Sequence, residues 1–305
     1  MEAIKKVYHL NLDQAGLSER INSNQTPFMQ RLVQAGFSSF GRIFPNTAAK
    51  LAFRFFSTPR HRARHKISDP ILERARLFEL LYGGQILKAY EWGRGEKTVL
   101  LVHGWESRGT ALRSFVPPLV EMGYRVVAFD GPAHGNSGGK RTNLPHFGGA
   151  VRAVINHLGG VYGMICHSFG GASTVFALWN IDPRIQVEKL VLLAVPNRMS
   201  HVIASAAKSM NLPRVVTRKF KSIIEEKLNL PIEAANLENA YGKIKVTDAL
   251  IVHDKADPVV PFSGSRALFE AWDNASMIVT EGLGHYRLIK HPELVGSVTR
   301  FMHQE

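Results

Sequence analysis

The segment VYGMICHSFGGASTVFALW (residues 161–179) contains an apolar run, then a serine followed by two glycines, then a second apolar segment. A short continuous apolar run is typical of a strand buried on both faces of a parallel sheet. The segment therefore predicts a strand, a sharp turn that carries Ser168, and a helix over Gly170–Trp179. Turns of this kind follow the pattern G-x-S-x-G, but Cys166 stands at the position of the first glycine.

The same alternation of strand and helix extends on both sides of this segment. Continuous apolar runs predict strands over residues 85–92, 98–104, 125–131, 161–167, 189–195, 248–254 and 276–282, and apolar periodicity predicts helices over 112–121, 147–158 and 170–179. Alternating strands and helices favour an α/β domain whose functional site lies at the carboxyl ends of mostly parallel strands.

Two segments do not fit that alternation. The 52 residues between Val195 and Asp248 far exceed an ordinary crossover and contain a helical stretch, RVVTRKFKSIIEEKL. We expect residues 196–247 to form a helical cap insertion that roofs a pocket. Residues 1–83 are expected to form a basic helical N-terminal extension, with helices over 27–44 and 46–56, and residues 84–305 the α/β domain.

Composition narrows the class of protein. The chain has 305 residues, 45% of them hydrophobic, one cysteine and a net charge of +13. There is no secretory signal pattern, no apolar run long enough to span a membrane and no cysteine framework, so a cytoplasmic location is expected. No cofactor or metal is predicted, because no glycine loop suits a dinucleotide and no histidine–carboxylate cluster has ligand spacing.

Basic residues are concentrated at the amino-terminal end. Residues 1–66 hold 11 Lys/Arg and 3 Asp/Glu, and the densest stretch is RHRARHK, residues 60–66. The favoured interpretation is that this region docks on its own domain. Peripheral membrane contact through residues 1–66 stays open, because basic, phenylalanine-rich helices can lie on a membrane surface. Nucleic-acid binding is not expected, because no recognisable module accompanies the charge.

Serine-based acyl transfer requires a nucleophile, a base, an acid and donors for an oxyanion. Ser168 is the candidate nucleophile, and His285 in TEGLGHYRLI is the candidate base. Asp257 in LIVHDKADPVVP is preferred to Asp254 as the acid, because two nearby prolines fix a rigid turn around it. The order serine, aspartate, histidine is that of hydrolases with this strand–turn–helix serine.

The remaining site residues surround these three. The backbone N–H groups of Trp105 and Phe169 are the candidate oxyanion donors. The supporting residues are His103, Gly104, Cys166, His167 and Gly170: glycine permits close backbone approach at 104 and 170, His103 braces the loop, and cysteine is still compact. Two alternatives stay open, namely that Ser168 merely caps a helix or that Cys166 is the nucleophile.

Five motifs in sequence order resemble those of the α/β-hydrolase superfamily, in its serine hydrolase branch: LLVHGWESRG, VVAFDGPAHGNSGG, CHSFGG, HDKADPVVP and GLGHYRL. The resemblance covers about residues 84–305. It implies the α/β-hydrolase fold and a triad of Ser168, Asp257 and His285, with oxyanion N–H groups on Trp105 and Phe169. The HGWE loop and the basic extension also resemble a group of bacterial hydrolases of undefined substrate.

The expected function is a carboxylesterase-like serine hydrolase that cleaves a carboxylic ester or thioester through an acyl-serine intermediate, with a small-molecule acyl substrate. Amidase, C–C hydrolase and acyltransferase activities use the same triad, so the sequence does not separate them. A non-catalytic ligand-binding protein on the same fold is the alternative of another class. Substrate identity and oligomeric state stay open.

Overall fold

The computed structural model describes residues 5–10, 28–65, 68–182 and 184–304. The chain divides into two compact units. The first comprises residues 1–14, 59–197 and 237–305, and the second comprises residues 15–58 and 198–236. None of the described helices combines the length and apolar character needed to cross a bilayer.

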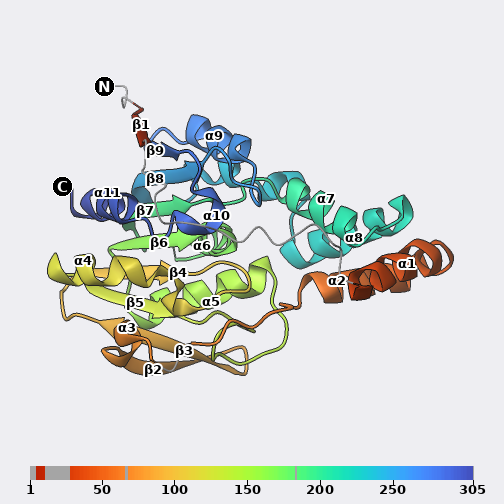
Figure 1. The fold of residues 1–305 in the computed structure, drawn as a ribbon, viewed down its shortest axis with the longest axis horizontal. Helices are drawn as coiled ribbons and strands as arrows, with labels where there is room; N and C mark the ends of the chain where they lie inside the picture. The colour runs from red at the N-terminus through yellow and green to blue at the C-terminus, as the bar shows by residue number, and fades with distance from the viewer. Residues whose placement is uncertain (1–4, 11–27, 66–67, 183, 305) are drawn as a thin grey trace. The chain divides into compact units, whose positions relative to one another are not determined.

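Within the described residues, the first unit contains one nine-stranded sheet with the order β1-β9-β8-β7-β6-β4-β5-β3-β2 (Figure 1). The strands are β1 (Val7–Leu10), β2 (Arg76–Tyr82), β3 (Gln85–Trp92), β4 (Thr98–Val102), β5 (Arg125–Phe129), β6 (Gly163–His167), β7 (Val187–Leu193), β8 (Val246–Asp254) and β9 (Ala275–Thr280). Only the pairs β2–β3 and β3–β5 are antiparallel. Every residue of β4 and β6 is buried, which confirms the prediction of a mostly parallel sheet covered on both faces.

Helices cover the two faces of this sheet. They are α3 (Pro70–Glu73), α4 (Val116–Glu121), α5 (Leu144–His157), α6 (Phe169–Trp179), α9 (Phe262–Ala271), α10 (Gly284–Arg287) and α11 (Pro292–His303), with 3₁₀ turns η1 (Gly109–Phe115) and η3 (Leu237–Ala240). The strand order reverses at β4, and parallel crossovers are right-handed, so α4 lies on one face and α5, α6 and α9 on the other. Contacts of α5 with α6, and of α11 with α4, agree with this division.

The reversal at β4 also positions the site. β4 lies between β5 and β6, so the loops that follow β4 and β6 leave the sheet side by side. In open α/β sheets a crevice forms at this point, outside the carboxyl ends of the strands. Ser168 directly follows β6, and the predicted oxyanion loop directly follows β4.

Two strands lie within residues 1–83, where the sequence predicted only helices. β1 adds to the edge of the sheet by pairing in parallel with β9, from Val7 opposite Met277 to Leu10 opposite Thr280. β2 pairs with β3 at the other edge. Both are edge strands with largely exposed residues, so neither has the continuous apolar pattern that reveals the central strands.

The predicted helix over residues 112–121 is instead two elements. The 3₁₀ turn η1 ends at Phe115, and α4 starts at Val116. Pro117 and Pro118 follow immediately, and a proline suits the first turn of a helix better than its interior. The two prolines therefore mark the start of a new helix.

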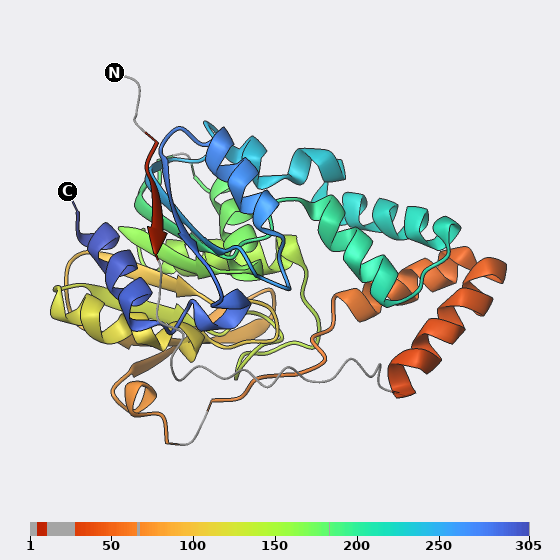
Figure 2. The ribbon, with the colours of Figure 1, turned by 45° about the horizontal axis from the view of Figure 1, so that its top comes forward.

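The second unit is helical. It contains α1 (Phe28–Ile43), α2 (Pro45–Phe56), α7 (Met199–Ser209), α8 (Arg214–Leu228) and the 3₁₀ turn η2 (Ile232–Ala235), so the helices predicted in both segments are present. α2 lies beside α8 in Figures 1 and 2, and the rings of Phe56 and Phe220 meet edge to face at 5.4 Å. The function of residues 196–247 as a roof over a pocket stays a prediction.

Candidate active site

Ser168 occupies a strained turn between β6 and α6. Its backbone has φ 52° and ψ −127°, a left-handed conformation that is rare for a residue other than glycine and that concentrates at functional sites. The turn depends on the glycines that follow. A Cβ on Gly170 would lie 2.2 Å from the carbonyl oxygen of His103, and one on Gly171 would lie 2.3 Å from Val195. The two glycines after Ser168 thus permit the sharp turn that the sequence predicts.

Cys166 does not prevent this turn. It is fully buried in the middle of the sheet, opposite Val102 of β4 and Leu192 of β7. Burial raises the pKa of its thiol to about 12, so almost no nucleophilic thiolate exists at neutral pH. The structure therefore favours Ser168 over Cys166 as the nucleophile.

We expect Cys166 to be inert to thiol reagents in the folded protein. Ellman's reagent should release about one equivalent of product only after denaturation, because the thiol is buried and protonated. N-ethylmaleimide should likewise leave any hydrolytic activity unchanged. Rapid labelling of the native protein, with loss of activity in step, would show that Cys166 is exposed and reactive.

Three residues from distant parts of the chain form one chain of hydrogen bonds. Ser168 Oγ lies 3.0 Å from His285 Nε2, and His285 Nδ1 lies 2.8 Å from Asp257 Oδ2. His285 stands on the short helix α10, and Asp257 lies in the loop after β8. The structure thus brings together the three residues that the sequence predicts as nucleophile, base and acid, in the geometry of a serine triad.

Asp257 is held in place by more than the histidine. Its Oδ1 accepts hydrogen bonds from the N–H groups of Val259 and Val260 at 2.7 and 2.9 Å, and His253 Nε2 lies 3.4 Å from its Oδ2. Burial alone would raise the pKa of Asp257, but the hydrogen bonds from His253, His285 and Val260 outweigh it and lower this pKa well below its ordinary value. The carboxylate is therefore ionised at neutral pH.

Asp254, the other candidate acid, does not contact His285. Its side chain accepts hydrogen bonds from Thr280 Oγ1 and from the N–H groups of Ala256 and Leu283 at 2.8 to 2.9 Å. These contacts join the loop after β8 to the loop after β9. Asp254 therefore stabilises the two loops that carry Asp257 and His285.

His167 also contacts His285. Its Nε2–H donates to the carbonyl oxygen of His285 at 3.0 Å, and the two rings lie 4.8 Å apart. Burial, together with the nearby His285, lowers the pKa of His167 to about 3, so the ring is neutral at physiological pH. His167, directly before Ser168 in the sequence, therefore fixes the loop that carries His285.

The loop after β4 lies against Ser168. A Cβ on Gly104 would lie 3.1 Å from Ser168 Cβ, and the rings of Trp105 and Phe169 meet edge to face at 5.2 Å. Among the described residues, neither Trp105 N–H nor Phe169 N–H donates a hydrogen bond. Both predicted oxyanion donors thus belong to backbone directly beside Ser168.

Two buried histidines shape this loop. His103 Nδ1–H donates to the carbonyl oxygen of Gly104 at 2.7 Å, and its Nε2 accepts from Gly131 N–H at 2.9 Å. His134 Nε2 accepts from Glu106 N–H at 3.0 Å, where the Glu106 backbone has a left-handed φ of 53°. Burial is the main cause that lowers the pKa of both rings, that of His134 to about 3. The sequence predicts that His103 braces the loop, but it carries no local signal for the role of His134.

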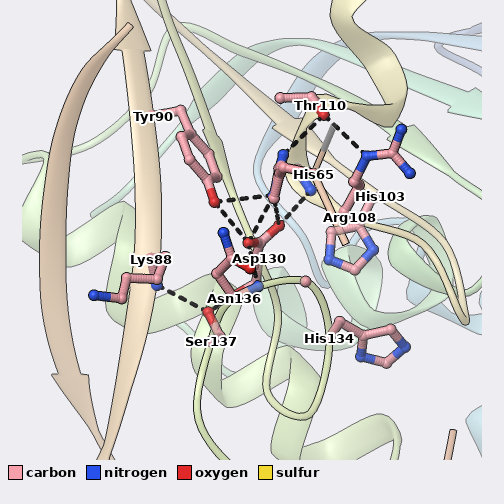
Figure 3. Close-up of polar contacts among 12 residues, drawn as sticks. His65, Lys88, Tyr90, His103, Arg108, Thr110, Asp130, His134, Asn136 and Ser137 are labelled. Carbon is pink, nitrogen blue, oxygen red and sulfur yellow. Dashed lines mark hydrogen bonds and ion pairs between the residues drawn. The ribbon is translucent and has the colours of Figure 1, made fainter. Parts of the chain in front are cut away.

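The buried carboxylate of Asp130 joins several segments near the site through hydrogen bonds (Figure 3). It accepts hydrogen bonds from His65 Nε2 at 2.9 Å, Tyr90 Oη at 2.7 Å and the N–H groups of Gly109 and Asn136 at 2.7 and 2.8 Å. Burial alone would raise the pKa of Asp130, but the hydrogen bond and charge of His65, with the two N–H groups, lower it below 3.8. Asp130 therefore stabilises the fold as an anion.

The Asp130 carboxylate should make folding sensitive to acid. Its pKa is lower in the folded than in the unfolded chain, so its stabilisation is complete above the unfolded value, near 4, and is lost as pH falls through the folded value. Asp130→Asn should lower the free energy of unfolding at pH 7 by about 3 kcal/mol, because it breaks a buried pair.

Urea unfolding between pH 7 and pH 3 provides the measurement. Asp130→Asn should show a shallower loss of stability with acid than the unaltered protein, because it lacks this titrating group. Asp273→Asn, which removes a carboxylate whose side chain is 69% exposed, is the matched control and should follow the unaltered protein. Identical pH profiles for Asp130→Asn and the unaltered protein would contradict the role of Asp130.

The basic stretch RHRARHK docks on its own unit over residues 60–65; Lys66 lies outside the described residues. Arg62 Nε donates to the carbonyl oxygen of Gly135 at 2.8 Å, Arg60 N–H donates to Glu106 Oε1 at 2.6 Å, and His65 contacts Asp130 as above. The favoured interpretation of this stretch, docking on its own domain, is confirmed for these residues. The side chains of Arg62 and His65 therefore bind the loops around the site.

Known proteins provide an independent comparison. The model of the Alpha/beta hydrolase family matches residues 99–297, which is well over half of the chain. The chain belongs to the alpha/beta hydrolase family. This assignment agrees with the strand order, the strained Ser168 and the positions of Asp257 and His285 after β8 and β9.

Curated relatives of this alpha/beta hydrolase match it only in part. One is a 2-hydroxy-6-oxononadienedioate/2-hydroxy-6-oxononatrienedioate hydrolase of Escherichia coli O139:H28, 32% identical over 130 residues, which are 39% of this chain and 44% of that protein. The chain therefore matches less than half the length of this relative.

Solved structures match more of the hydrolase at lower identity. The Pyrococcus furiosus esterase Pf2001 is similar with a TM-score of 0.61 and 21% identity, over 81% of this chain and 96% of that one. A meta-cleavage product hydrolase, CumD, is similar with a TM-score of 0.55 and 18% identity, over 75% and 98%. At these identities the likeness supports the fold alone.

Proposed function

We propose that this protein is a serine hydrolase that cleaves a carboxylic ester or thioester through an acyl-Ser168 intermediate. The observation that carries the proposal is the unbroken hydrogen-bond chain from Ser168 Oγ through His285 to Asp257. A serine in this arrangement is activated by the base, and the base is oriented by the acid.

The first half of the reaction forms the acyl-enzyme. Ser168 Oγ attacks the substrate carbonyl carbon while its proton passes to His285 Nε2. Asp257 holds the imidazole and stabilises the imidazolium. The negative oxygen of the tetrahedral intermediate accepts hydrogen bonds from Trp105 N–H and Phe169 N–H. When the intermediate collapses, the bond to the leaving alcohol or thiol breaks, and His285 gives it the proton.

The second half releases the acid. Water loses a proton to His285 Nε2 and attacks the acyl carbon, and the bond to Ser168 Oγ breaks as His285 returns that proton to the serine. The positive end of the α6 dipole lies at Ser168 and favours the negative oxygen in both halves. Each step needs only the three side chains and the two backbone donors.

C–C hydrolysis of a vinylogous diketone is the second candidate function. It is favoured by the name of a similar protein, the Escherichia coli 2-hydroxy-6-oxononadienedioate/2-hydroxy-6-oxononatrienedioate hydrolase. In that case the leaving group is a carbon atom that must be protonated.

A fluorophosphonate probe and a substrate panel test the proposal. The probe should label Ser168, as located by mass spectrometry, and Ser168→Ala should abolish labelling. The panel contains p-nitrophenyl esters of increasing chain length, an acyl thioester and a 2-hydroxy-6-oxo-dienoate. Turnover of esters or thioesters supports the proposal, and turnover of the dienoate alone supports C–C hydrolysis. A folded protein that the probe does not label and that turns over no member of the panel would instead favour a non-catalytic ligand-binding protein.

A further inference from the structure

The first two helices of the second unit leave several of their large apolar side chains exposed. Leu51 and Phe55 of α2 are 40% and 44% exposed, and Ile43 and Phe44, where α1 meets α2, are 72% and 53% exposed. Large apolar side chains are normally the first to be buried. We call the group the α1–α2 surface; its apolar members are Leu32, Phe40, Ile43, Phe44, Leu51 and Phe55.

Most of the core of the second unit is formed by other side chains, although the ring of Phe55 also meets that of the buried Phe37 edge to face at 6.0 Å. α2 presents a face of small residues, Ala48, Ala49 and Ala52, all fully buried, and this helix packs on α8. A Cβ on Gly41 of α1 would lie 3.0 Å from Val216 of α8, so small residues let these helices approach closely. α1 and α2 therefore bury alanine and Phe37 but leave two leucines, an isoleucine and three phenylalanines exposed, an arrangement that favours an external apolar partner.

Basic side chains flank the apolar ones. α1 and α2 contain Arg31, Arg42, Lys50 and Arg54, all exposed, and no acidic residue. At 3.6 residues per turn, Lys50 and Arg54 form a stripe beside the stripe of Leu51 and Phe55.

The charge extends through the whole unit. Residues 15–58 and 198–236 hold 12 Lys/Arg and 4 Asp/Glu, a net charge of +8 out of the +13 of the chain. A surface that combines exposed aromatic and aliphatic side chains with lysine and arginine matches the boundary between headgroups and acyl chains of an anionic bilayer.

We infer that the α1–α2 surface docks on an anionic lipid bilayer. Lys50, Arg54 and their neighbours contact lipid phosphates, while Leu51, Phe55 and the junction of the two helices enter the acyl boundary. A second copy of the chain is disfavoured as the partner, because it would bring the same positive charge to the contact. This inference is independent of the proposed function, because it uses no residue of the candidate active site.

Vesicle flotation tests the charged half of the surface. The whole chain should float with vesicles of phosphatidylcholine and 30% phosphatidylglycerol, but not with phosphatidylcholine alone. Each basic side chain at an anionic bilayer contributes roughly a factor of five, so the double variant Lys50→Gln/Arg54→Gln should bind roughly thirtyfold more weakly. Arg214→Gln/Arg218→Gln on α8 removes the same charge at the same spacing outside the α1–α2 surface and should weaken binding much less.

The depth to which the apolar side chains enter the bilayer tests the other part of the inference. All four tryptophans belong to the first unit, so Phe55→Trp introduces a reporter in the second. Lipids brominated on their acyl chains should quench this tryptophan in anionic vesicles. Leu51→Ser/Phe55→Ser should reduce vesicle binding roughly a hundredfold while circular dichroism shows the helices intact.

Several results would overturn the inference. These are failure of the unaltered protein to float with anionic vesicles, equal weakening by the two charge variants, or a Phe55→Trp reporter that stays unquenched when the protein is bound to vesicles. Size-exclusion chromatography without lipid tests the alternative partner, a second copy of the chain. A dimer that becomes a monomer in Leu51→Ser/Phe55→Ser, together with no flotation, would assign the surface to self-association.

Discussion

Ser168→Ala is expected to lower kcat on the best ester of the panel by about 10⁵- to 10⁶-fold, with little change in KM. Removing the nucleophile of a working triad disables base and acid as well, so the loss is nearly that of the whole triad. The residual rate comes from the oxyanion donors and from substrate positioning. Steady-state kinetics on the purified variant provide the measurement.

The Ser168→Ala variant should fold. Alanine already occupies left-handed backbone at Ala133 and Ala194, with φ of 66° and 50°, so the strained turn tolerates this side chain. Thermal unfolding should therefore change by only a few degrees. Ser297→Ala, which alters a serine on α11 outside the site, is the matched control and should keep full activity. More than 1% residual activity in a folded Ser168→Ala variant would remove Ser168 from the mechanism.

Asp257→Asn is expected to lower kcat by about 10⁴-fold while the protein stays folded. An amide in place of the carboxylate stabilises the wrong tautomer of His285 and cannot stabilise the imidazolium. The N–H groups of Val259 and Val260 still find an oxygen acceptor in the amide, so the loop keeps its shape. Kinetics at saturating substrate, alongside thermal unfolding, separate the catalytic loss from a loss of stability.

Asp254→Asn is the matched control for this second prediction. Asp254 holds the same two loops but does not touch His285, so its variant should lose stability and lose less than about tenfold in kcat. The reverse ranking, with Asp254→Asn the slower enzyme, would make Asp254 the acid and overturn the role given to Asp257.

The meeting of Ser168, Asp257 and His285 was predictable because each follows its own buried strand. Central strands carry a strong local signal, a continuous apolar run, and the carboxyl ends of neighbouring parallel strands meet at one edge of the sheet. Chain order and strand position were therefore enough to bring together residues more than 100 positions apart.

Other parts of the site were not predictable, because their signals are not local. His65 belongs to a stretch whose obvious property is charge, and only its contact with Asp130, 65 residues away, shows that it serves as a hydrogen-bond donor. His134 is one of 13 histidines, and its role follows from Glu106 and Pro132. Similarly, nothing in residues 28–56 predicts that they join residues 198–228 in a separate unit.

The pairing of β1 with β9 has a consequence for how the protein is made. Val7 leaves the ribosome long before Met277, so β1 has no partner until every other described strand of the sheet has been synthesised. This edge is therefore the last part of the sheet that can form, and a fusion partner that restrains β1 should slow maturation more than one attached after α11.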